Sequence, residues 1–568
     1  MSILNLTYEP MSSTDYIVIL AFSLLIFFIG LSFSKTSGKD MKSFFAAGGA
    51  VPWWINSLSL FMGFVSAGTF VVWGSIAYTS GWVSVSIQWT MSIAGFLVGF
   101  LIAPKWHKTK SLTAAEYISN RLGVNIQKAY SYIYLSIMVF MTGVYLYSVS
   151  RILEVSTGIQ LYLSIGLLGL IVIIYTTLGG LWAVVVTDVL QFVILTAAAI
   201  IVVPLSLDKV GGIQQFFNSL PSEGFFDFTN HEYTWSFLLG FGLYNFFYLS
   251  GQWGFVQRYT SVSTPKDARK VGWLFGVLYV ISPIIWMLPP MVYRALNPEL
   301  SGLQDEGAYL MMCKEALPAG MLGLMLISLV FATNSSVQGV LNISAGVITN
   351  DLYKVRFPKT SERKLMVIAK LASIFFGLVT ITIAMLVPFM GGAKEVVLSV
   401  AALTGCPMYM PLIWSLFSKK QTGKIVLATT VISLIITLSF KFLLPAIIDF
   451  NLSRSGEMIL GVVVPAVLII LSEIILRIRK TDISEYKQYQ ISVDKKIELE
   501  NVTEAAEESA VENKQGLRMI SIGILVTGLI IGVLGIMAEN GRITVIGTAV
   551  VLLMIGGRIF FKAKTSEK

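Results

Sequence analysis

The stretch from residue 320 to residue 353 reads GMLGLMLISLVFATNSSVQGVLNISAGVITNDLY. It is long enough to cross a lipid bilayer as a helix, which takes about 20 residues. Its middle nevertheless carries adjacent hydroxyl and amide side chains, and such groups at that depth face a cavity, a partner or an ion. The Ala332 carbonyl and the Ser335 and Ser336 hydroxyls are neutral oxygens on one helix, which is the ligand type that a small hard cation accepts.

The composition places the whole chain in a membrane. Hydrophobic residues make up 55% of the 568 residues and charged residues 13%, whereas soluble domains carry about 25% charged residues. Apolar windows of about 20 residues recur along almost the whole length, so we expect an all-α integral membrane protein with about fifteen transmembrane helices. The expected spans are 15–33, 53–78, 82–104, 130–155, 159–178, 181–205, 234–254, 271–292, 320–349, 366–389, 393–417, 424–447, 457–476, 519–537 and 543–561.

Basic residues are concentrated in every second connection between the spans. Examples are Lys105, Lys108 and Lys110 after the third span and Lys354 and Arg356 after the ninth. Because basic loops stay in the cytoplasm, this bias predicts a multi-pass protein of the cell (inner) membrane with its N-terminus outside and its C-terminus cytoplasmic. The net charge of +9 then reflects membrane topology, and we expect no nucleic-acid partner and no obligatory protein partner.

The sequence offers few groups for catalysis or metal binding. His107 and His231 are the only histidines, both near span ends, which disfavours a histidine-built metal site. Cys313 and Cys406 are the only cysteines, and we expect no disulfide between them. No Gly-x-x-x-x-Gly-Lys-Ser/Thr phosphate loop is present, which argues against ATP-driven pumping. We therefore expect no enzymatic activity and no cofactor, and any uphill transport would use an ion gradient.

The second span contains a segment with weakened helix propensity. Gly63 and Gly68 bracket it, and an interruption there would release the backbone carbonyls of Met62 and Val65. Transporter folds place such interruptions near the middle of the membrane, where the carbonyls bind Na⁺. The alternative is that the glycines only allow close helix packing.

The seventh span, five spans later, contains a stretch, residues 243–254, that is also interrupted by glycines. A pair of broken helices in corresponding halves points to a binding site between inverted repeats. Asn245, Tyr248 and Gln252 offer donors, acceptors and a stacking face, which suits a small hydroxylated or amide-bearing solute. The alternative is a set of interhelical hydrogen bonds. Gln88 in the third span is open to the same two interpretations.

Two further charged sites lie inside spans. Asp188 needs a cation, a basic partner or water, and we favour a structural pair with a Lys or Arg of an inside loop over a role as ion ligand. Arg151 and Glu154 lie one helical turn apart, and their mutual pairing is the simplest expectation.

Short motifs occur in a fixed order along the chain. They are Pro52-Trp53-Trp54, Tyr175-Thr-Thr-Leu-Gly179-Gly180 leading to Thr187-Asp188 and Gln191, Gln257-Arg258, Ala332-x-x-Ser335-Ser336, Leu341-Asn342, and Asp351-x-Tyr353. Together, over about residues 15–480, they resemble the sodium:solute symporter family, which includes sodium/glucose, proline, pantothenate and sialic-acid transporters.

The resemblance implies the LeuT-type fold, which consists of two inverted repeats of five helices with flanking extra helices. The implied organisation is an N-terminal extra helix and first inside loop (1–50), the first repeat (51–205), the second repeat with its outer loops (206–420), flanking helices (421–480), a hydrophilic inside linker (481–516) and accessory C-terminal helices (517–568). The linker, rich in glutamate, is expected to be solvated.

The resemblance also implies residue roles. The sodium site falls on the carbonyls of Met62, Val65 and Ala332 and on the hydroxyls of Ser335 and Ser336.

Asn245 and Gln88 become solute contacts, and Tyr248 becomes the aromatic residue that closes the inner gate. Gln252 is expected to belong to the same solute site. Thr69 and Tyr279 stand where sugar transporters carry larger amide or basic contacts, so the resemblance does not fix the solute.

A second sodium site in some family members uses hydroxyls three and four residues after the first serine, together with the aspartate that corresponds to Asp188. Gln338 and Gly339 stand at those positions here. Gln338 still offers a side-chain oxygen, either to an ion or to a structural contact, whereas Gly339 offers no side-chain ligand, so we expect one Na⁺ per solute.

The expected function is Na⁺-coupled symport of a small polar solute, with a sugar or sugar-like compound favoured. Alternatives are a membrane sensor built on a transporter scaffold, a channel, or a symporter of an amino acid, a sugar acid or another organic anion. The expected partners are Na⁺, the solute and the lipid bilayer.

Overall fold

A computed structural model describes residues 11–33, 51–111, 113–175, 181–221, 223–354, 356–357, 359–448, 452–500 and 505–565. These residues form helices joined by turns and loops, and they contain no β-strand. The prediction of an all-α protein is therefore confirmed for the described part of the chain.

The helices of the first half are α1 (Ser13–Phe33), α3 (Trp53–Phe64), α4 (Ala67–Ser80), α5 (Val83–Leu101), α6 (Ala103–Lys108), α7 (Ala114–Leu122), α8 (Val124–Thr157), α9 (Leu161–Tyr175), α10 (Leu181–Lys209), α11 (Ile213–Ser219), α12 (Trp235–Gly251), α13 (Trp253–Thr260) and α14 (Pro265–Leu296). The second half contains η2 (Gly302–Gly307), α15 (Ala308–Ala316), α16 (Met321–Gly346), η3 (Val347–Lys354), α17 (Glu362–Leu386), η4 (Val387–Met390), α18 (Gly392–Val400), η5 (Ala401–Gly405), α19 (Cys406–Trp414), α20 (Gly423–Leu438), η6 (Ser439–Leu443), α21 (Leu444–Ile448), α22 (Arg454–Ile478), α23 (Ser484–Glu500), α24 (Ala505–Met537) and α25 (Arg542–Thr565).

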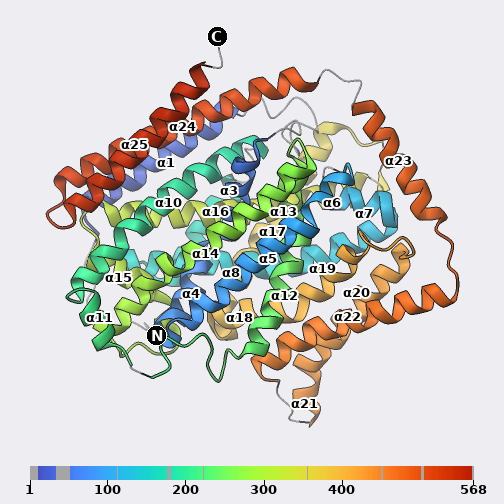
Figure 1. Cartoon of the computed structure of the whole chain (residues 1–568), viewed down its shortest axis with the longest axis horizontal. Coiled ribbons are helices and arrows are strands. Elements are labelled where there is room, and N and C mark those ends of the chain that lie inside the picture. The colour runs from blue at the N-terminus through green and yellow to red at the C-terminus, as the bar shows by residue number, and fades with distance from the viewer. Residues whose placement is uncertain are drawn as a thin grey trace.

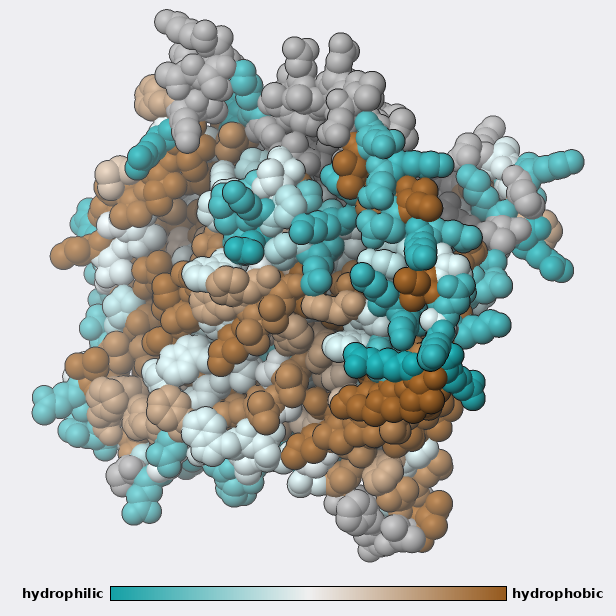
Figure 2. Space-filling view, turned by 45° about the vertical axis from the view of Figure 1, so that its right-hand side comes forward, coloured by the Kyte–Doolittle hydropathy of each residue, from teal (hydrophilic) through white to brown (hydrophobic). Residues whose placement is uncertain are grey.

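Many of these helices are suited to a bilayer. Within the described ranges, 10 are long and apolar enough to cross a membrane, and the bent pair α3–α4 raises the number to 11. Shorter apolar segments lie in α1, α9 and α16. Figure 2 shows a broad band of hydrophobic side chains between more hydrophilic upper and lower edges. Within the described residues each expected span falls on one or more helices, but the number of fifteen spans stays a prediction.

The second expected span is broken, in agreement with the first of the two interpretations of its glycines. α3 and α4 meet at an angle of 61°. Val65 and Ser66 between them are extended, and the Ser66 hydroxyl accepts a hydrogen bond from the Gly68 N–H while Thr69 Oγ1 accepts one from the Ser66 N–H. This reciprocal cap supplies partners for the first N–H groups of α4, which stabilises the new helix start.

The seventh expected span is interrupted at one residue. α12 ends at Gly251 and α13 begins at Trp253, with Gln252 extended between them at φ −64° and ψ 128°. A side chain on Gly251 would place its Cβ only 2.7 Å from a ring carbon of Tyr409, so the glycine also permits close packing against α19. Both interpretations of the interrupting glycines, helix breaking and close packing, therefore apply here.

The first helix and the last two helices lie together on one side of the bundle. In Figure 1, α24 and α25 lie beside α1 and α10, whereas α20 and α22 lie at the other end. α1 also packs on α16, and the approach is so close that a Cβ on Gly323 would lie 2.4 Å from the Asp15 carbonyl oxygen. This contact fixes the N-terminal end of the helix that carries the candidate sodium ligands.

The hydrophilic linker contains regular structure, and most of the α23 side chains are exposed. Much of it is helical, since it contains α23 and the beginning of α24. Tyr486, Tyr489, Val493 and Lys496 lie on one face of α23 and are at least partly buried, and α23 packs on α7. Their spacing of three to four residues is that of one helical face, a signal that the charge-rich composition obscures.

Candidate sodium and solute site

The break between α3 and α4 lies against α16. The backbone N–H of Ala67 donates a 2.8 Å hydrogen bond to Thr333 Oγ1, and the Thr333 hydroxyl donates to the Leu329 carbonyl at 2.8 Å. Thr333 directly follows Ala332, so the structure brings the two predicted halves of the sodium site together. The sequence prediction did not include Thr333; its signal was a hydroxyl beside a predicted carbonyl ligand.

The three candidate sodium ligands that would bind through backbone carbonyls are buried in this junction, whereas Ser336 is partly buried. The exposed fractions of Met62, Val65 and Ala332 are 1%, 0% and 0%. The Met62 carbonyl accepts a 3.1 Å bond from the Val65 N–H, and the Ala332 carbonyl accepts a 3.2 Å bond from the Ser336 hydroxyl. Each carbonyl oxygen has a second lone pair that can face a cation.

Some predicted residues have no described side chain. The side chains of Ser335 and Gln338 lie outside the described part of α16, as does the motif segment 176–180.

The two amides assigned to the solute lie on neighbouring helices, α5 and α12. Asn245 Nδ2 donates to Thr90 Oγ1 at 3.0 Å, and Gln88 Nε2 donates to the Ser84 carbonyl at 3.4 Å. The carbonyl oxygens of both amides, Asn245 Oδ1 and Gln88 Oε1, are buried and have no hydrogen-bond partner among the described residues. A buried acceptor without a partner is costly, and the hydroxyl of a solute would relieve that cost.

Thr69 and Tyr279 serve the architecture around the break. Thr69 caps α4, as described above. Tyr279 on α14 packs its ring against Phe61 and Phe275, with ring centroids 5.1 and 4.8 Å apart. Its exposed fraction is 1%, so it forms part of the wall that joins α14 to α3.

Tyr248 and Gln252 lie where α12 passes into α13. The Tyr248 ring contacts Phe64 at the end of α3 and Tyr409 on α19, both at centroid distances of 5.6 Å. Gln252 uses both ends of its amide, because Nε2 donates to the Tyr134 hydroxyl at 3.2 Å and Oε1 accepts from the Phe255 N–H at 2.8 Å. Tyr248 thus bridges the two broken helices, while Gln252 holds the second break in shape.

Asp188 is paired with a basic residue. Arg258 Nη2 lies 3.6 Å from Asp188 Oδ2, and that oxygen also accepts a 2.6 Å bond from the Ser59 hydroxyl. Arg258 further donates to Ser59 Oγ at 3.2 Å and to the Gly254 carbonyl at 2.8 Å. This network joins α10, α3 and α13, and it satisfies charges that would be costly in isolation. Arg151 and Glu154 also form an ion pair with each other.

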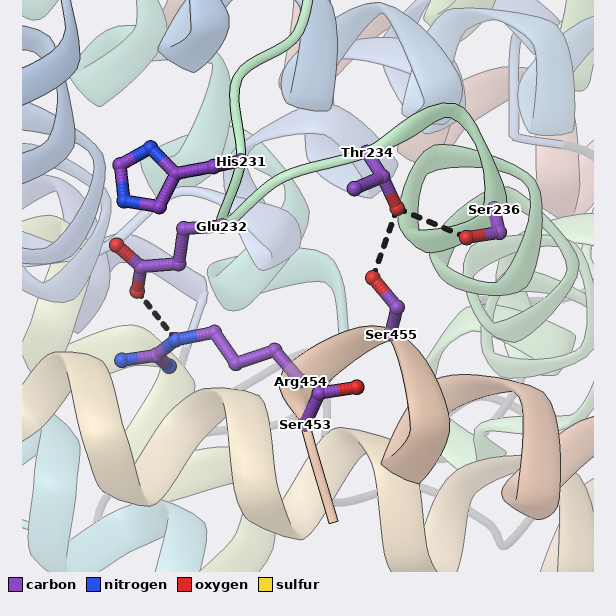
Figure 3. Close-up of a pocket in the computed structure, with 7 residues that line it drawn as sticks. All are labelled: His231, Glu232, Thr234, Ser236, Ser453, Arg454 and Ser455. Atoms are coloured by element: carbon purple, nitrogen blue, oxygen red, sulfur yellow. Dashed lines mark hydrogen bonds and ion pairs between the residues drawn. The ribbon is translucent and has the colours of Figure 1, made fainter.

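A polar recess of about 420 Å³ lies at the beginnings of α12 and α22 (Figure 3). Arg454 forms ion pairs with Glu232 and Glu395 there, and Thr234 Oγ1 lies 2.8 Å from the hydroxyls of both Ser236 and Ser455. None of the candidate sodium or solute residues lines this recess.

Comparisons with known proteins agree with the motif order. The model of the sodium:solute symporter family matches residues 44–432. The sodium/sialic acid symporter SiaT of Proteus mirabilis is 27% identical over 449 residues, which cover 75% of this chain and 89% of that protein. The sodium/glucose cotransporter of Vibrio parahaemolyticus is 26% identical over 76% of this chain and 86% of its own length.

Eukaryotic relatives and solved structures show the same likeness. The sodium/myo-inositol cotransporter 2 of Mus musculus is 28% identical over 66% of this chain, although this covers only 61% of that longer protein. A solved substrate-bound, outward-open Na⁺-coupled sialic acid symporter has a TM-score of 0.67 at 24% identity, covering 80% of this chain and 96% of its own, which shows a shared fold. The chain belongs to the sodium:solute symporter family.

Proposed function

We propose that the protein carries one Na⁺ together with one small, uncharged polar solute, a sugar or sugar-like compound, into the cell by alternating access. The contact that carries this proposal is the 2.8 Å bond from Ala67 to Thr333, because it holds the α3–α4 break against the helix of Ala332 and Ser336. The sodium ligands in this proposal are the carbonyls of Met62, Val65 and Ala332 and the hydroxyls of Ser335 and Ser336.

The character of the candidate solute contacts favours a neutral solute. Thr69, Gln88, Asn245, Gln252 and Tyr279 are all uncharged, and a charged solute would call for an opposite charge or a dense set of donors. The partnerless oxygens of Gln88 and Asn245 suit the hydroxyl groups of a sugar or polyol. Relatives that carry glucose or myo-inositol support the same class.

The proposed stoichiometry rests on residues of the second sodium site. Asp188 is engaged by Ser59 and Arg258, and Gly339 has no side-chain oxygen. A single ion is sufficient energetically. Moving one charge through 100 mV supplies about 2.3 kcal/mol, and a tenfold Na⁺ gradient adds about 1.4 kcal/mol, so together they support a solute gradient of several hundredfold.

In the proposed cycle, the two repeats (51–205 and 206–420) move relative to each other around the bound ion. Na⁺ bridges the α3–α4 break and α16, and it must bind the solute-ready conformation more tightly than the alternative one, since an ion with equal affinity for both would shift nothing. The orientation with the N-terminus outside follows from the basic connections.

A screen of purified protein tests this function and its solute class. Sugars, polyols, sugar acids and amino acids are compared for thermal stabilisation with Na⁺ and with choline, and stabilising compounds are then measured for uptake into proteoliposomes. The proposal predicts that a neutral polyhydroxyl compound stabilises the protein more strongly in Na⁺ and is accumulated. Preference for a charged amino acid or organic anion would contradict the solute class.

A further inference from the structure

The linker helix α23 packs on α7 (Figure 1). Lys496 Nζ lies 2.6 Å from Glu116 Oε1 and donates to the Lys110 carbonyl at 3.4 Å. The Tyr489 ring meets the Tyr117 ring edge to face at 5.9 Å. One face of α23 thus attaches to α7 and to the turn before it through both an ion pair and an aromatic contact.

Beneath α23, aromatic residues lead to the second helix break. The Tyr117 ring packs against the Trp106 ring at 5.1 Å, and the Trp106 indole N–H donates a 2.7 Å bond to the Ser250 carbonyl. Ser250 lies two residues before Gln252, where α12 is interrupted. Tyr489, Tyr117 and Trp106 therefore form a continuous series of edge-to-face contacts from the linker to the end of α12.

A second branch reaches the last core helix. The Arg121 guanidinium lies 5.1 Å from the centre of the Tyr486 ring and donates to the Ser418 and Gln421 carbonyls at 3.2 and 3.1 Å. The Tyr117 hydroxyl lies 2.9 Å from Ser415 Oγ at the end of α19, and burial raises the pKa of Tyr117 to about 12, so the phenol stays neutral there. α23 thus covers the point where α7, which follows α5 of the first repeat, meets the end of α19 of the second.

We propose that α23 is a clamp that holds this side of the transporter closed by pressing α7 and α6 onto the end of α12. This inference rests on the proposed function, because the clamp acts on the inner opening of the alternating-access cycle. Movement of α12 away from α19 would pull Ser250 from Trp106 and strain the edge-to-face contacts beneath α23. Release of α23 would then favour the inward-open conformation.

The contact is of a kind that can detach and reattach. The side chains of Lys496 and Glu116 are 39% and 32% exposed, and ion pairs with that exposure contribute about 1 kcal/mol or less. Tyr486 and Tyr489 are half-buried, and the opposite face of α23, including Gln488, Ile491 and Lys495, is exposed. α23 is thus attached through the side chains of one face only and is joined by short connections to α22 and α24.

The test uses the full-length protein with a cysteine reporter under the clamp. Ser250→Cys is introduced after Cys313 and Cys406, both buried, are replaced by alanine. The labelling rate with a membrane-impermeant maleimide added to the α23 side is measured without solute, in Na⁺ and in choline. We expect Lys496→Glu and Tyr489→Ala each to raise this rate about threefold to fivefold, as loss of a partly exposed contact would.

Two matched variants separate clamp release from damage to the fold. Lys495→Glu makes the same charge change on the exposed face and should leave the rate unchanged. Glu116→Lys combined with Lys496→Glu restores the ion pair in reverse and should return the rate towards that of the parent. Unchanged labelling in both Lys496→Glu and Tyr489→Ala, in chains that unfold at the parent's temperature, would overturn the clamp.

The outcome is separable from the proposed function because labelling needs no solute. Faster labelling in a chain that shows no Na⁺-driven uptake would support the clamp and contradict the symport proposal. Unchanged labelling in a chain that accumulates solute with Na⁺ would contradict the clamp and support the symport proposal.

Discussion

Ala67 and Thr333 are 266 positions apart in the sequence, yet the Ala67 N–H donates a 2.8 Å hydrogen bond to the Thr333 hydroxyl. The N–H belongs to the first residue of α4, where a helix leaves its N–H groups without partners in the helix itself. The hydroxyl of α16 supplies one partner across the helix interface. The bond therefore fixes the position of the break relative to the helix that carries the proposed sodium ligands.

Thr333→Val should weaken sodium binding. The substitution keeps the shape of the side chain but leaves the buried Ala67 N–H without its acceptor, at a cost of about 1–3 kcal/mol. We expect part of this cost to destabilise the Na⁺-bound form relative to the Na⁺-free form. The Na⁺ concentration for half-maximal uptake should therefore rise about tenfold. Thr349→Val is the matched control, since the Thr349 hydroxyl in η3 donates to the Ala345 carbonyl one turn earlier, at the end of α16. Equal effects of the two variants would contradict the role assigned to Thr333.

Asn245→Ala should raise the KM for the solute about tenfold, the loss expected for one buried hydrogen bond to the substrate. Thr90→Val removes the hydroxyl that accepts from Asn245 Nδ2 but leaves the amide in place. It should therefore raise KM less than Asn245→Ala does. Initial uptake rates over a range of solute concentrations at saturating Na⁺ give the KM of both variants. An unchanged KM in Asn245→Ala would remove this residue from the solute site.

Arg258→Met should strongly destabilise the protein. It leaves the Asp188 carboxylate, 1% exposed, without its arginine, and loss of one partner of a buried ion pair costs about 3–5 kcal/mol. The double variant Asp188→Asn with Arg258→Met removes both charges and should regain much of the loss. Thermal unfolding of the purified proteins compares them; a double variant that is less stable than Arg258→Met would contradict the proposed pairing energy.

Asp15→Ala should loosen the beginning of α16. Asp15 Oδ1 accepts 2.8 Å bonds from the N–H groups of both Gly320 and Gly323, and loss of such a cap costs about 1–2 kcal/mol. Hydrogen exchange of peptides that contain these two glycines should become faster. Asp15→Asn keeps an acceptor oxygen and should show a smaller change, whereas identical exchange in all three proteins would argue against the cap.

Local features of the helices around the candidate site could be predicted from the sequence, because they depend on neighbouring residues. The glycines that bracket Val65 weaken the helix there, and the break is found at Val65 and Ser66. The interruption in the seventh span was likewise predicted near Gly251, and it occurs at Gln252. For Asp188 the sequence left a cation, a basic partner or water open and favoured a Lys or Arg, but its chemistry alone did not single out Arg258.

Contacts between distant segments could not be predicted in the same way. Nothing near Thr333 indicates that it meets Ala67, and nothing near Asp15 indicates that it caps α16, because both depend on how the helices pack. α23 was missed because its charged residues dominate the composition, whereas its contact with α7 depends on Tyr486, Tyr489, Val493 and Lys496 at helical spacing. A solvated helix and a docked one differ by only these few side chains.

The Na⁺ dependence of solute uptake in Ser336→Ala tests the central claim most directly. Ser336 donates its hydroxyl to the Ala332 carbonyl, so its oxygen lies beside another proposed ligand. Uptake into proteoliposomes is measured against Na⁺ concentration, with choline keeping the ionic strength constant and Ser328→Ala, another serine that bonds within α16, as control. The account predicts a rise of about tenfold or more in the half-saturating Na⁺ concentration for Ser336→Ala and none for the control. An unchanged Na⁺ dependence in Ser336→Ala, or full uptake in choline alone, would contradict it.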